Sequence, residues 1–269
     1  MNAKMIELAI EGIGLCAPGL PSWNDAREVL SGARPYTPGA PQRPAPALLS
    51  ANERRRAPDS VLLALAVAEQ ACAMAGRDAK TLPNVFASAY GDLAINDYLC
   101  AELARAPLDI SPTKFHNSVH NAPAGYWTIA TGCMASSSAV SAGAATFGAA
   151  LLETALIVSR DGAPALLAVF DTMAQGPLTD VIVSNPPFGL ALVLGPDATA
   201  GAARLRLRID APAVGGLAPL PASLHSLQAT NPAAAGLPLL AALARRESAT
   251  LSVPAGPAGT PDLHLEILF

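Results

Sequence analysis

The chain has 269 residues and a formal net charge of −4, and 51% of its residues are hydrophobic while only 4% are aromatic and 14% are charged. Because no stripe of Lys and Arg alternates with aromatic residues, this composition argues against nucleic acid as a partner. The length allows a sizeable core in one domain, or in two small domains that share a sheet. A chain this rich in Ala, Leu and Val often buries further surface in a partner protein.

The cysteines show no paired spacing and have no histidine neighbours, so we expect free thiols in a reducing cytoplasm and no metal site. They are Cys16, Cys72, Cys100 and Cys133. Glu7 and Glu11 lie in the first apolar run, which argues against a signal peptide. Residues 115–152 carry no charge, but Asn, His and Pro interrupt them, which indicates a buried core segment and no membrane span.

The first predicted elements are a strand and a short helix. Apolar residues alternate over Ile6–Ile13 and predict a strand, which Gly12 and Gly14 are expected to end. Ser22 is followed three residues later by an acid, and this cap predicts a helix over Trp23–Leu30.

The middle of the chain alternates loops, helices and strands. Five prolines over residues 33–50 predict an irregular surface loop. Helical spacing of apolar residues predicts helices over 58–75 and Asp92–Arg105. Between them, Asn84–Ala89 is expected to be a short buried strand. The Asn- and Pro-rich stretch Pro112–Pro123 is expected to be a loop.

The most informative pattern is a predicted strand over Trp127–Thr131 that turns at Gly132-Cys133 into a helix from about Met134 to Glu153. That geometry places the Cys133 thiol at a helix N-terminus, where free N–H groups and the macrodipole favour the thiolate. The other expected elements are strands over Ala165–Phe170, Phe188–Leu194, Arg204–Asp210, Ala249–Val253 and Leu263–Leu268, and a helix over Pro238–Arg246. This order predicts an α/β layered fold with a mixed sheet.

Several segments resemble a known family. The opening Ile6–Gly32, the Cys133 turn and the run Phe188–Leu194 resemble the N-terminal half of ketoacyl synthases, whose fold is thiolase-like. More narrowly, three segments resemble the short ketosynthase-like chain length factors of aryl polyene gene clusters. They are Ala51–Arg56, Ser111–Trp127 and Phe170–Leu178. The resemblance implies a ketoacyl-synthase-like domain over residues 1–210 and a short remnant of the second half, packed on the first, over 211–269.

Two departures from the ketoacyl synthases bear on function. Their second half carries two catalytic histidines and a Gly-Phe-Gly-Gly loop, whereas the only histidines after Cys133 here are His225 and His264, in unrelated settings. The resemblance therefore implies a non-catalytic chain length factor without cofactor, in which Cys133 marks a vestigial nucleophile position. Such a subunit pairs with a full-length ketoacyl synthase, and the complex elongates polyene or polyketide chains held by an acyl carrier protein.

The resemblance also places an interface near the acyl tunnel of the partner. The residues expected there are Phe115, His116, Asn117, His120, Asn121, Tyr126, Trp127 and Ile129. His116 and His120 are four residues apart, but the prolines around them and the lack of a following Glu argue against a metal site. Interface or hydrogen-bonding roles are the better interpretation.

Other interpretations stay open at the level of sequence. Cys133 with His116 or His120 as base would make a stand-alone acyltransferase or thioesterase. An acyl-binding homodimer without a synthase partner is a third possibility. Arg54–Arg56 fit either a solvated turn or a contact with an acidic carrier. His264 alternates with leucines and is expected on the wet face of a strand, without a role.

Overall fold

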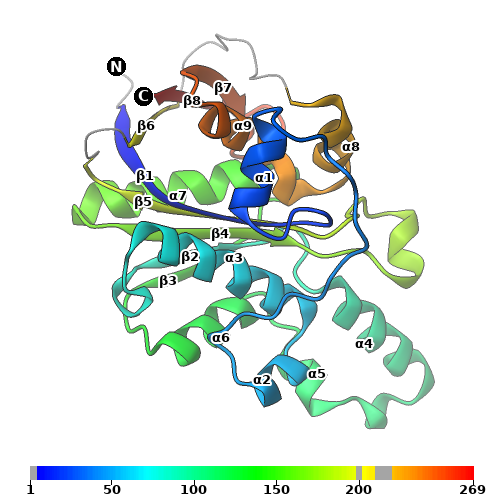
Figure 1. Ribbon diagram of the computed structural model, residues 1–269. Helices are drawn as coiled ribbons and strands as arrows, with labels where there is room; N and C mark the ends of the chain where they lie inside the picture. Colours follow the sequence, from blue (N-terminus) through cyan, green and yellow to red (C-terminus); the bar gives the residue numbers. More distant parts are fainter. Residues whose placement is uncertain (1–4, 198–201, 210–219) are drawn as a thin grey trace.

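The computed structural model describes residues 5–197, 202–209 and 220–269. Within them, a mixed sheet of eight strands in the order β3-β2-β4-β5-β1-β6-β8-β7 lies between two layers of helices (Figure 1). The strands are β1 (Ile6–Cys16), β2 (Asn84–Ala87), β3 (Ser137–Val140), β4 (Ala165–Asp171), β5 (Phe188–Gly195), β6 (Ala203–Arg208), β7 (Ala249–Val253) and β8 (Leu263–Leu268). The expected α/β class with a mixed sheet is confirmed.

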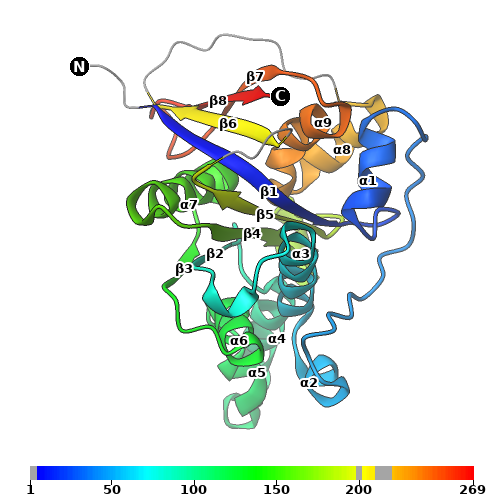
Figure 2. The ribbon, with the colours of Figure 1, turned by 60° about the vertical axis from the view of Figure 1, so that its left-hand side comes forward.

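The helices divide between the two faces of the sheet (Figures 1 and 2). They are α1 (Trp23–Leu30), α2 (Ala51–Arg56), α3 (Asp59–Ala75), α4 (Leu93–Arg105), α5 (Pro112–His116), α6 (Ala122–Thr131), α7 (Thr146–Asp161), α8 (Ala222–Thr230) and α9 (Leu237–Arg245), with short 3-10 turns η1 to η5 between them. One hydrophobic cluster joins α1, α7, α8 and α9 to the sheet, and a second joins α3 and α6 to its other face. None of the described helices is long and apolar enough to cross a bilayer.

Two glycines in β1 let α3 approach the sheet directly. A Cβ on Gly12 would lie 2.1 Å from the Ala71 carbonyl oxygen, and one on Gly14 would lie 2.0 Å from the Val67 carbonyl oxygen. The strand continues past both glycines to Cys16, so the expectation that they end it is wrong. Their role is close helix–strand packing, which glycine alone allows here.

Most of the strongly patterned elements lie where the sequence predicts them. Ser22 caps α1, and its hydroxyl accepts a hydrogen bond from the Asp25 amide. The helix α3 ends at Gly76, which adopts the left-handed conformation at φ 62°. The side chains of β6 alternate between buried and partly or fully exposed, as its alternating sequence predicts.

Residues 112–161 differ from the prediction. The predicted strand Trp127–Thr131 is part of the helix α6, and the predicted helix 134–153 contains instead the strand β3 and only the start of α7. Part of the predicted loop Pro112–Pro123 is the helix α5. The Thr128 and Thr131 hydroxyls donate to the carbonyls four residues earlier, at 2.8 and 2.7 Å, which satisfies them inside a helix.

The C-terminal segment completes the same sheet. β8 pairs with β6 and β7, and α9 packs against α1. The sequence did not predict α8, and the boundary placed at residues 210/211 lies outside the described residues. His264 of β8 is 8% exposed and its Nδ1 lies 2.7 Å from Ser252 Oγ, so its expected place on a wet face is wrong.

Candidate functional site

The strand-to-helix connection of this fold runs from β3 through residues 141–145 into α7. The polar side chains in and directly after this connection are the hydroxyls of Ser141 and Thr146, and both form hydrogen bonds with backbone groups. Ser141 Oγ donates to the Ala89 carbonyl at 3.1 Å. Thr146 Oγ1 accepts from the Ala142 amide at 2.9 Å and donates to the Gly143 carbonyl at 2.7 Å. Neither hydroxyl is presented as a nucleophile with a base beside it.

Cys133 lies elsewhere. It follows α6, whose C-terminal cap Gly132 has φ 69°, and it precedes β3. Cys133 is 1% exposed, and its thiol donates to the Leu82 carbonyl at 3.4 Å, with Asn84 Nδ2 3.8 Å away. The expected turn from strand to helix N-terminus at Cys133 is therefore wrong, because the preceding segment is helical and the following one extended.

A buried amide fixes the start of β3. Asn84 is fully buried and its Oδ1 accepts a hydrogen bond from Ser137 Oγ at 2.6 Å, while its Nδ2 donates to the Leu82 carbonyl at 3.2 Å. Since Asn84 and Ser137 also face each other in the parallel register of β2 and β3, the side chains and the backbone specify the same pairing. We call this side-chain hydrogen bond between Asn84 and Ser137 the clamp, and the thiol of Cys133 packs on it.

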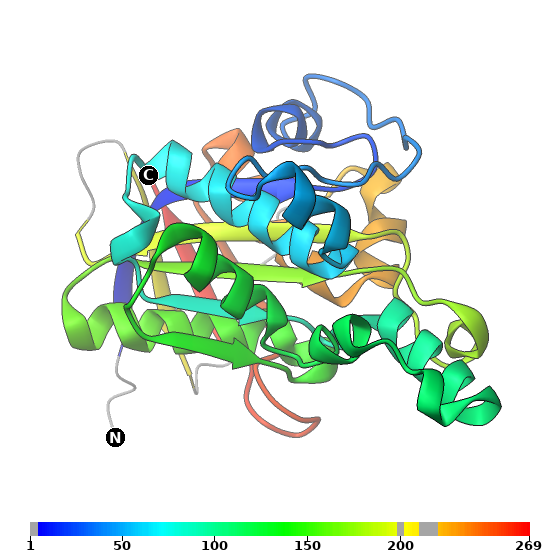
Figure 3. The same ribbon diagram turned by 90° about the horizontal axis from the view of Figure 1, so that it is seen from below.

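β3 is an open edge of the sheet. It pairs only with β2 among the described strands, and its residues alternate between exposed and half-buried (Figure 3, the green strand at the margin of the sheet). The Asn84 and Ser88 amides donate to the carbonyls of Ser136 and Val140. Because the N–H and C=O of one residue point to the same side of a strand, the intervening backbone groups of Ser137 and Ala139 point away from the sheet.

The predicted interface residues fall into two groups. Phe115 and Ile129 are exposed, at 64% and 80%, and His116 and Asn121 are also exposed. Trp127 is fully buried, with its ring centroid 6.0 Å from that of Phe86, and is a core residue.

The remaining predicted residues are partly or fully buried. The buried Asn117 Oδ1 accepts from Tyr126 Oη at 3.3 Å, and the half-buried His120 has its Nε2 2.9 Å from the Ser88 carbonyl oxygen. These contacts tie the segment around α5 to α6 and to the end of β2.

Exposed large apolar side chains concentrate on α4, α5, α6 and the segments that follow them. They are Leu103, Leu108, Phe115, Val119, Ile129 and Met134. Their elements lie together below the sheet and toward its β3 side (Figures 1 and 3). Exposed large apolar side chains gathered on one set of elements are typical of a protein–protein contact.

A buried acid closes β4 and was not singled out from the sequence. Asp171 is 1% exposed, and its Oδ1 accepts from Ser88 Oγ at 2.7 Å and from the amides of Ala89 and Tyr90 at 3.0 and 3.3 Å. Its Oδ2 has no hydrogen-bond partner within the described residues. Burial raises the pKa of Asp171 to about 7, although these hydrogen bonds oppose the shift. An acid directly after an apolar strand was the available signal.

A second feature missed at the level of sequence is a groove of about 900 Å³. It lies between α3, α4, α5, the proline-rich segment and the residues after β4, and of the predicted tunnel residues only Asn117 lines it. In the described part of the chain, no three His, Cys, Asp or Glu side chains gather as metal ligands would.

Comparisons with known proteins identify the family. The family model "Beta-ketoacyl synthase, N-terminal domain" matches residues 30–255. No curated protein matches this sequence.

Three solved structures share the fold. A chain of the ketosynthase ApeO in complex with its chain length factor ApeC from Xenorhabdus doucetiae aligns at a TM-score of 0.71 and 21% identity, covering 97% of this chain and 99% of that chain. A chain of the type II polyketide AntDE:AntF complex of ketosynthase and acyl-carrier protein gives 0.68 and 12%, covering 98% and 99%. The ishigamide ketosynthase/chain length factor gives 0.66 and 14%, covering 97% and 98%. The expected thiolase-like ketosynthase fold is confirmed.

Proposed function

Because this chain belongs to the β-ketoacyl synthase N-terminal domain family, we propose that it is a non-catalytic chain length factor. It pairs with a full-length ketoacyl synthase, and the complex elongates acyl chains carried by an acyl carrier protein in polyketide or aryl polyene synthesis. The observation that carries the proposal is the strand-to-helix connection after β3, the place where condensing enzymes of this fold present their nucleophile. Residues 141–145 supply no thiol, and the Ser141 hydroxyl is bonded to the backbone.

The alternative of a stand-alone acyltransferase needs Cys133 beside a histidine. The Cys133 thiol is bonded to Leu82 and adjoins Asn84, at the start of β2, whereas His120 contacts Ser88, just past its end. Four residues of strand at about 3.3 Å each separate the two ends by roughly 13 Å. Proton transfer needs a contact of about 3 Å, so this arrangement favours a packing role for Cys133.

The other histidines are no better placed. His225 is exposed on α8, and His116 is exposed at the end of α5. His264 is bonded to Ser252 on the last two strands, at the opposite end of the sheet order from β3. This distribution supports a subunit that leaves decarboxylation and condensation to its partner.

The proposed contact with the synthase comprises β3 and the exposed apolar side chains around α5 and α6. The outward N–H and C=O groups of Ser137 and Ala139 offer an edge for strand addition. Phe115 and Ile129, both exposed, would be covered by the partner. Because the predicted strand Trp127–Thr131 is part of the helix α6, it is β3 that offers the strand edge in this proposal.

Co-expression with a full-length ketoacyl synthase and a carrier protein tests the proposal. Ala139→Pro removes an outward N–H without touching the bonds to β2, and we expect it to abolish co-purification and elongation, while the matched Ala139→Val retains both. Cys133→Ala should leave the carrier-bound products unchanged by mass spectrometry. Elongation that disappears in Cys133→Ala while the complex still forms would refute the non-catalytic role. A homodimer that ignores the synthase would refute the pairing.

A further inference from the structure

The sheet has a second open edge, at β7. Among the described strands β7 pairs only with β8, and it is the last strand of the sheet order, at the end opposite β3 (Figure 2). The pairing of β7 with β8 runs without a shift of register. Because successive residues of a strand point their N–H and C=O groups to alternate sides, β7 presents a row of backbone groups away from β8.

β7 lacks the features that usually protect an open edge. Edge strands of monomeric proteins commonly carry a proline, a bulge or charged side chains, lysine above all, which prevent pairing with another strand. The five residues of β7, Ala249-Thr-Leu-Ser-Val253, include no charge and no proline, and they form no bulge. An edge of this composition is suited to pairing with a further strand.

The charges of this region lie on the neighbouring strands instead. β6 is an interior strand and carries Arg204, Arg206 and Arg208, and β8 carries Glu266. The Arg206 guanidinium is used within the sheet, with Nε 2.6 Å from Glu7 Oε2 and Nη1 3.5 Å from Glu266 Oε2. Charge is therefore placed inside the sheet and kept off its edge, which is the reverse of the usual protection.

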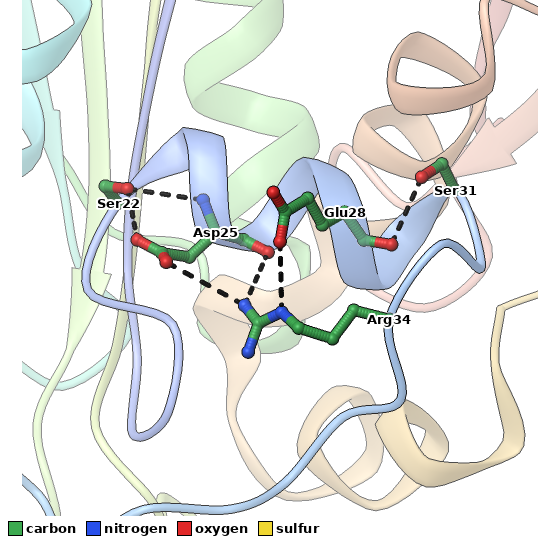
Figure 4. A network of polar contacts seen from close by, with 5 residues as sticks. All are labelled: Ser22, Asp25, Glu28, Ser31 and Arg34. Atoms are coloured by element: carbon green, nitrogen blue, oxygen red, sulfur yellow. Dashed lines mark hydrogen bonds and ion pairs between the residues drawn. The ribbon is translucent and has the colours of Figure 1, made fainter.

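The helix layer beside β7 has a different character. α9 packs against β7, and α1 packs on α9. The polar groups of α1 are satisfied locally (Figure 4): Arg34 donates to Glu28 Oε2 and to the Asp25 carbonyl, both at 3.1 Å, and the Ser22 and Ser31 hydroxyls bond at the two ends of the helix. A surface with its polar groups already bonded gains less from a partner than an edge with open backbone groups.

The sequence of β7 is complementary to itself about a two-fold axis. In antiparallel pairing centred on Leu251, each Leu251 meets its copy, Thr250 meets Ser252 of the second copy, and Ala249 meets Val253 of the second copy. This register uses all five residues, and it opposes outward groups to outward groups whichever alternate residues point away from β8. A register shifted by one residue would oppose outward groups to inward ones.

The same register matches both faces of the strand. Directly opposed residues of antiparallel strands project to the same face. Leu251 and Val253 belong to the hydrophobic core, at 2% and 5% exposure, so the apolar sides of the two copies would adjoin. Thr250 and Ser252 are half-buried on the other face, and opposed hydroxyl side chains stabilise paired strands.

An aromatic ring stands at one end of this edge. Ala249 pairs with Ile267, so Phe269 lies just beyond that pair, beside the start of β7. Phe269 is 39% exposed, and the Arg246 guanidinium carbon lies 5.2 Å from its ring centroid. A ring that is held in place and left exposed at the margin of the edge would add apolar contact area with a second copy.

We propose that β7 pairs with β7 of a second copy of this chain, about a two-fold axis at Leu251, to form a symmetric dimer with one continuous sheet. The proposed synthase contact at β3 lies at the opposite end of the sheet order, so both contacts can form together. The complex with the synthase would then hold two copies of each subunit. The dimer needs no synthase, so the inference does not rest on the proposed function.

Light scattering after gel filtration tests the inference on the full chain and on its complex with a co-expressed synthase. We expect twice the chain mass of 27.3 kDa for the chain alone, and twice the mass of a one-to-one pair for the complex. Ala139→Pro, which removes an outward N–H of β3, should leave the dimer of the chain alone intact. A monomeric chain, or a dimer that Ala139→Pro abolishes, overturns the proposal.

Proline at two successive positions tests the edge itself. The N–H groups of Ala249 and Thr250 point to opposite sides of β7, so one of Ala249→Pro and Thr250→Pro removes an outward donor and the other breaks a bond to β8. The variant that keeps the wild-type unfolding temperature should halve the mass, while valine at the same position should keep the dimer. A dimeric mass in both proline variants overturns the proposal.

A spin label locates the contact without weakening it. In the proposed register Thr250 and its copy are diagonal neighbours, about 7–8 Å apart. Nitroxides on Thr250→Cys, with the exposed Cys100 replaced by Ser, should therefore broaden each other's EPR spectrum. Labels on Asn52→Cys, an exposed position on α2 across the molecule from β7 (Figure 2), should give sharp spectra.

Sharp spectra at both labelled positions overturn the proposal. Broadened Thr250→Cys spectra in a chain that does not co-purify with the synthase would support the dimer and refute the proposed function, so the two failures are distinguishable.

Discussion

Replacing Asp171 by Asn should remove a pH dependence that this one side chain imposes on stability. Asp171 is 1% exposed, and burial raises its pKa from the ordinary value of 3.8 to about 7. Between these two values the folded protein holds a proton that the unfolded chain has released. Stability from this group is therefore fully present below about pH 4 and is lost as pH rises through 7. A difference of roughly three pH units between the folded and unfolded pKa corresponds to about 4 kcal/mol.

The asparagine side chain of Asp171→Asn would keep an acceptor for Ser88 and for the amides of Ala89 and Tyr90, and it cannot ionise. We expect the variant to be within about 2 kcal/mol of the wild type at pH 5. At pH 8 the variant should be more stable by up to about 4 kcal/mol. Urea denaturation followed by circular dichroism from pH 5 to 8 measures this difference. Asp180→Asn, at an exposed position, controls for the lost charge. Parallel stability curves for Asp171→Asn and wild type would refute the reasoning.

Three further substitutions test the packing around the site. Gly14→Ala should destabilise the fold by about 3 kcal/mol or more in denaturant titrations, because its Cβ would lie 2.0 Å from the Val67 carbonyl oxygen. Its control is Gly125→Ala, which has open space around the new Cβ and should be neutral or slightly stabilising. Asn84→Ala should cost about 1–3 kcal/mol and speed hydrogen exchange in β3, and unchanged exchange there would contradict the clamp. Ser252→Ala should cost about 1 kcal/mol in thermal unfolding through its lost bond to His264, so a loss of several kcal/mol would indicate a larger role.

The sequence pattern correctly predicted those elements in which the local spacing of apolar residues matches the burial observed in the fold. The helix α3 has a clear start, a run of apolar residues and Gly76 at its end, so its bounds follow from spacing. β4 and β5 are fully buried apolar runs, and β6 alternates along its length. In these segments the burial period matches the backbone period, and no distant contact is needed to choose between helix and strand.

Segment 122–145 shows where local pattern fails. Trp127, Ile129 and two threonines favour a strand by propensity, yet Trp127 packs on Phe86 and the threonines bond within a helix. Ser137–Val140 has little strand signal and becomes β3 because Asn84 and the backbone of β2 pair with it. Contacts between residues 41 and 53 positions apart decide these assignments, and a sequence window contains neither contact.

The features of the candidate site likewise fall into those that the sequence determines and those that only the fold decides. The sequence by itself determined the family resemblance, the missing catalytic histidines and the α/β class, because these depend on which residues are present and on their local spacing. Only the tertiary structure decided that Cys133 and His120 lie at opposite ends of β2, that Asp171 is buried and that the proline-rich segment forms one wall of a groove. Those facts depend on strand register and on chain crossing between distant segments, and register is fixed by the packed core as a whole.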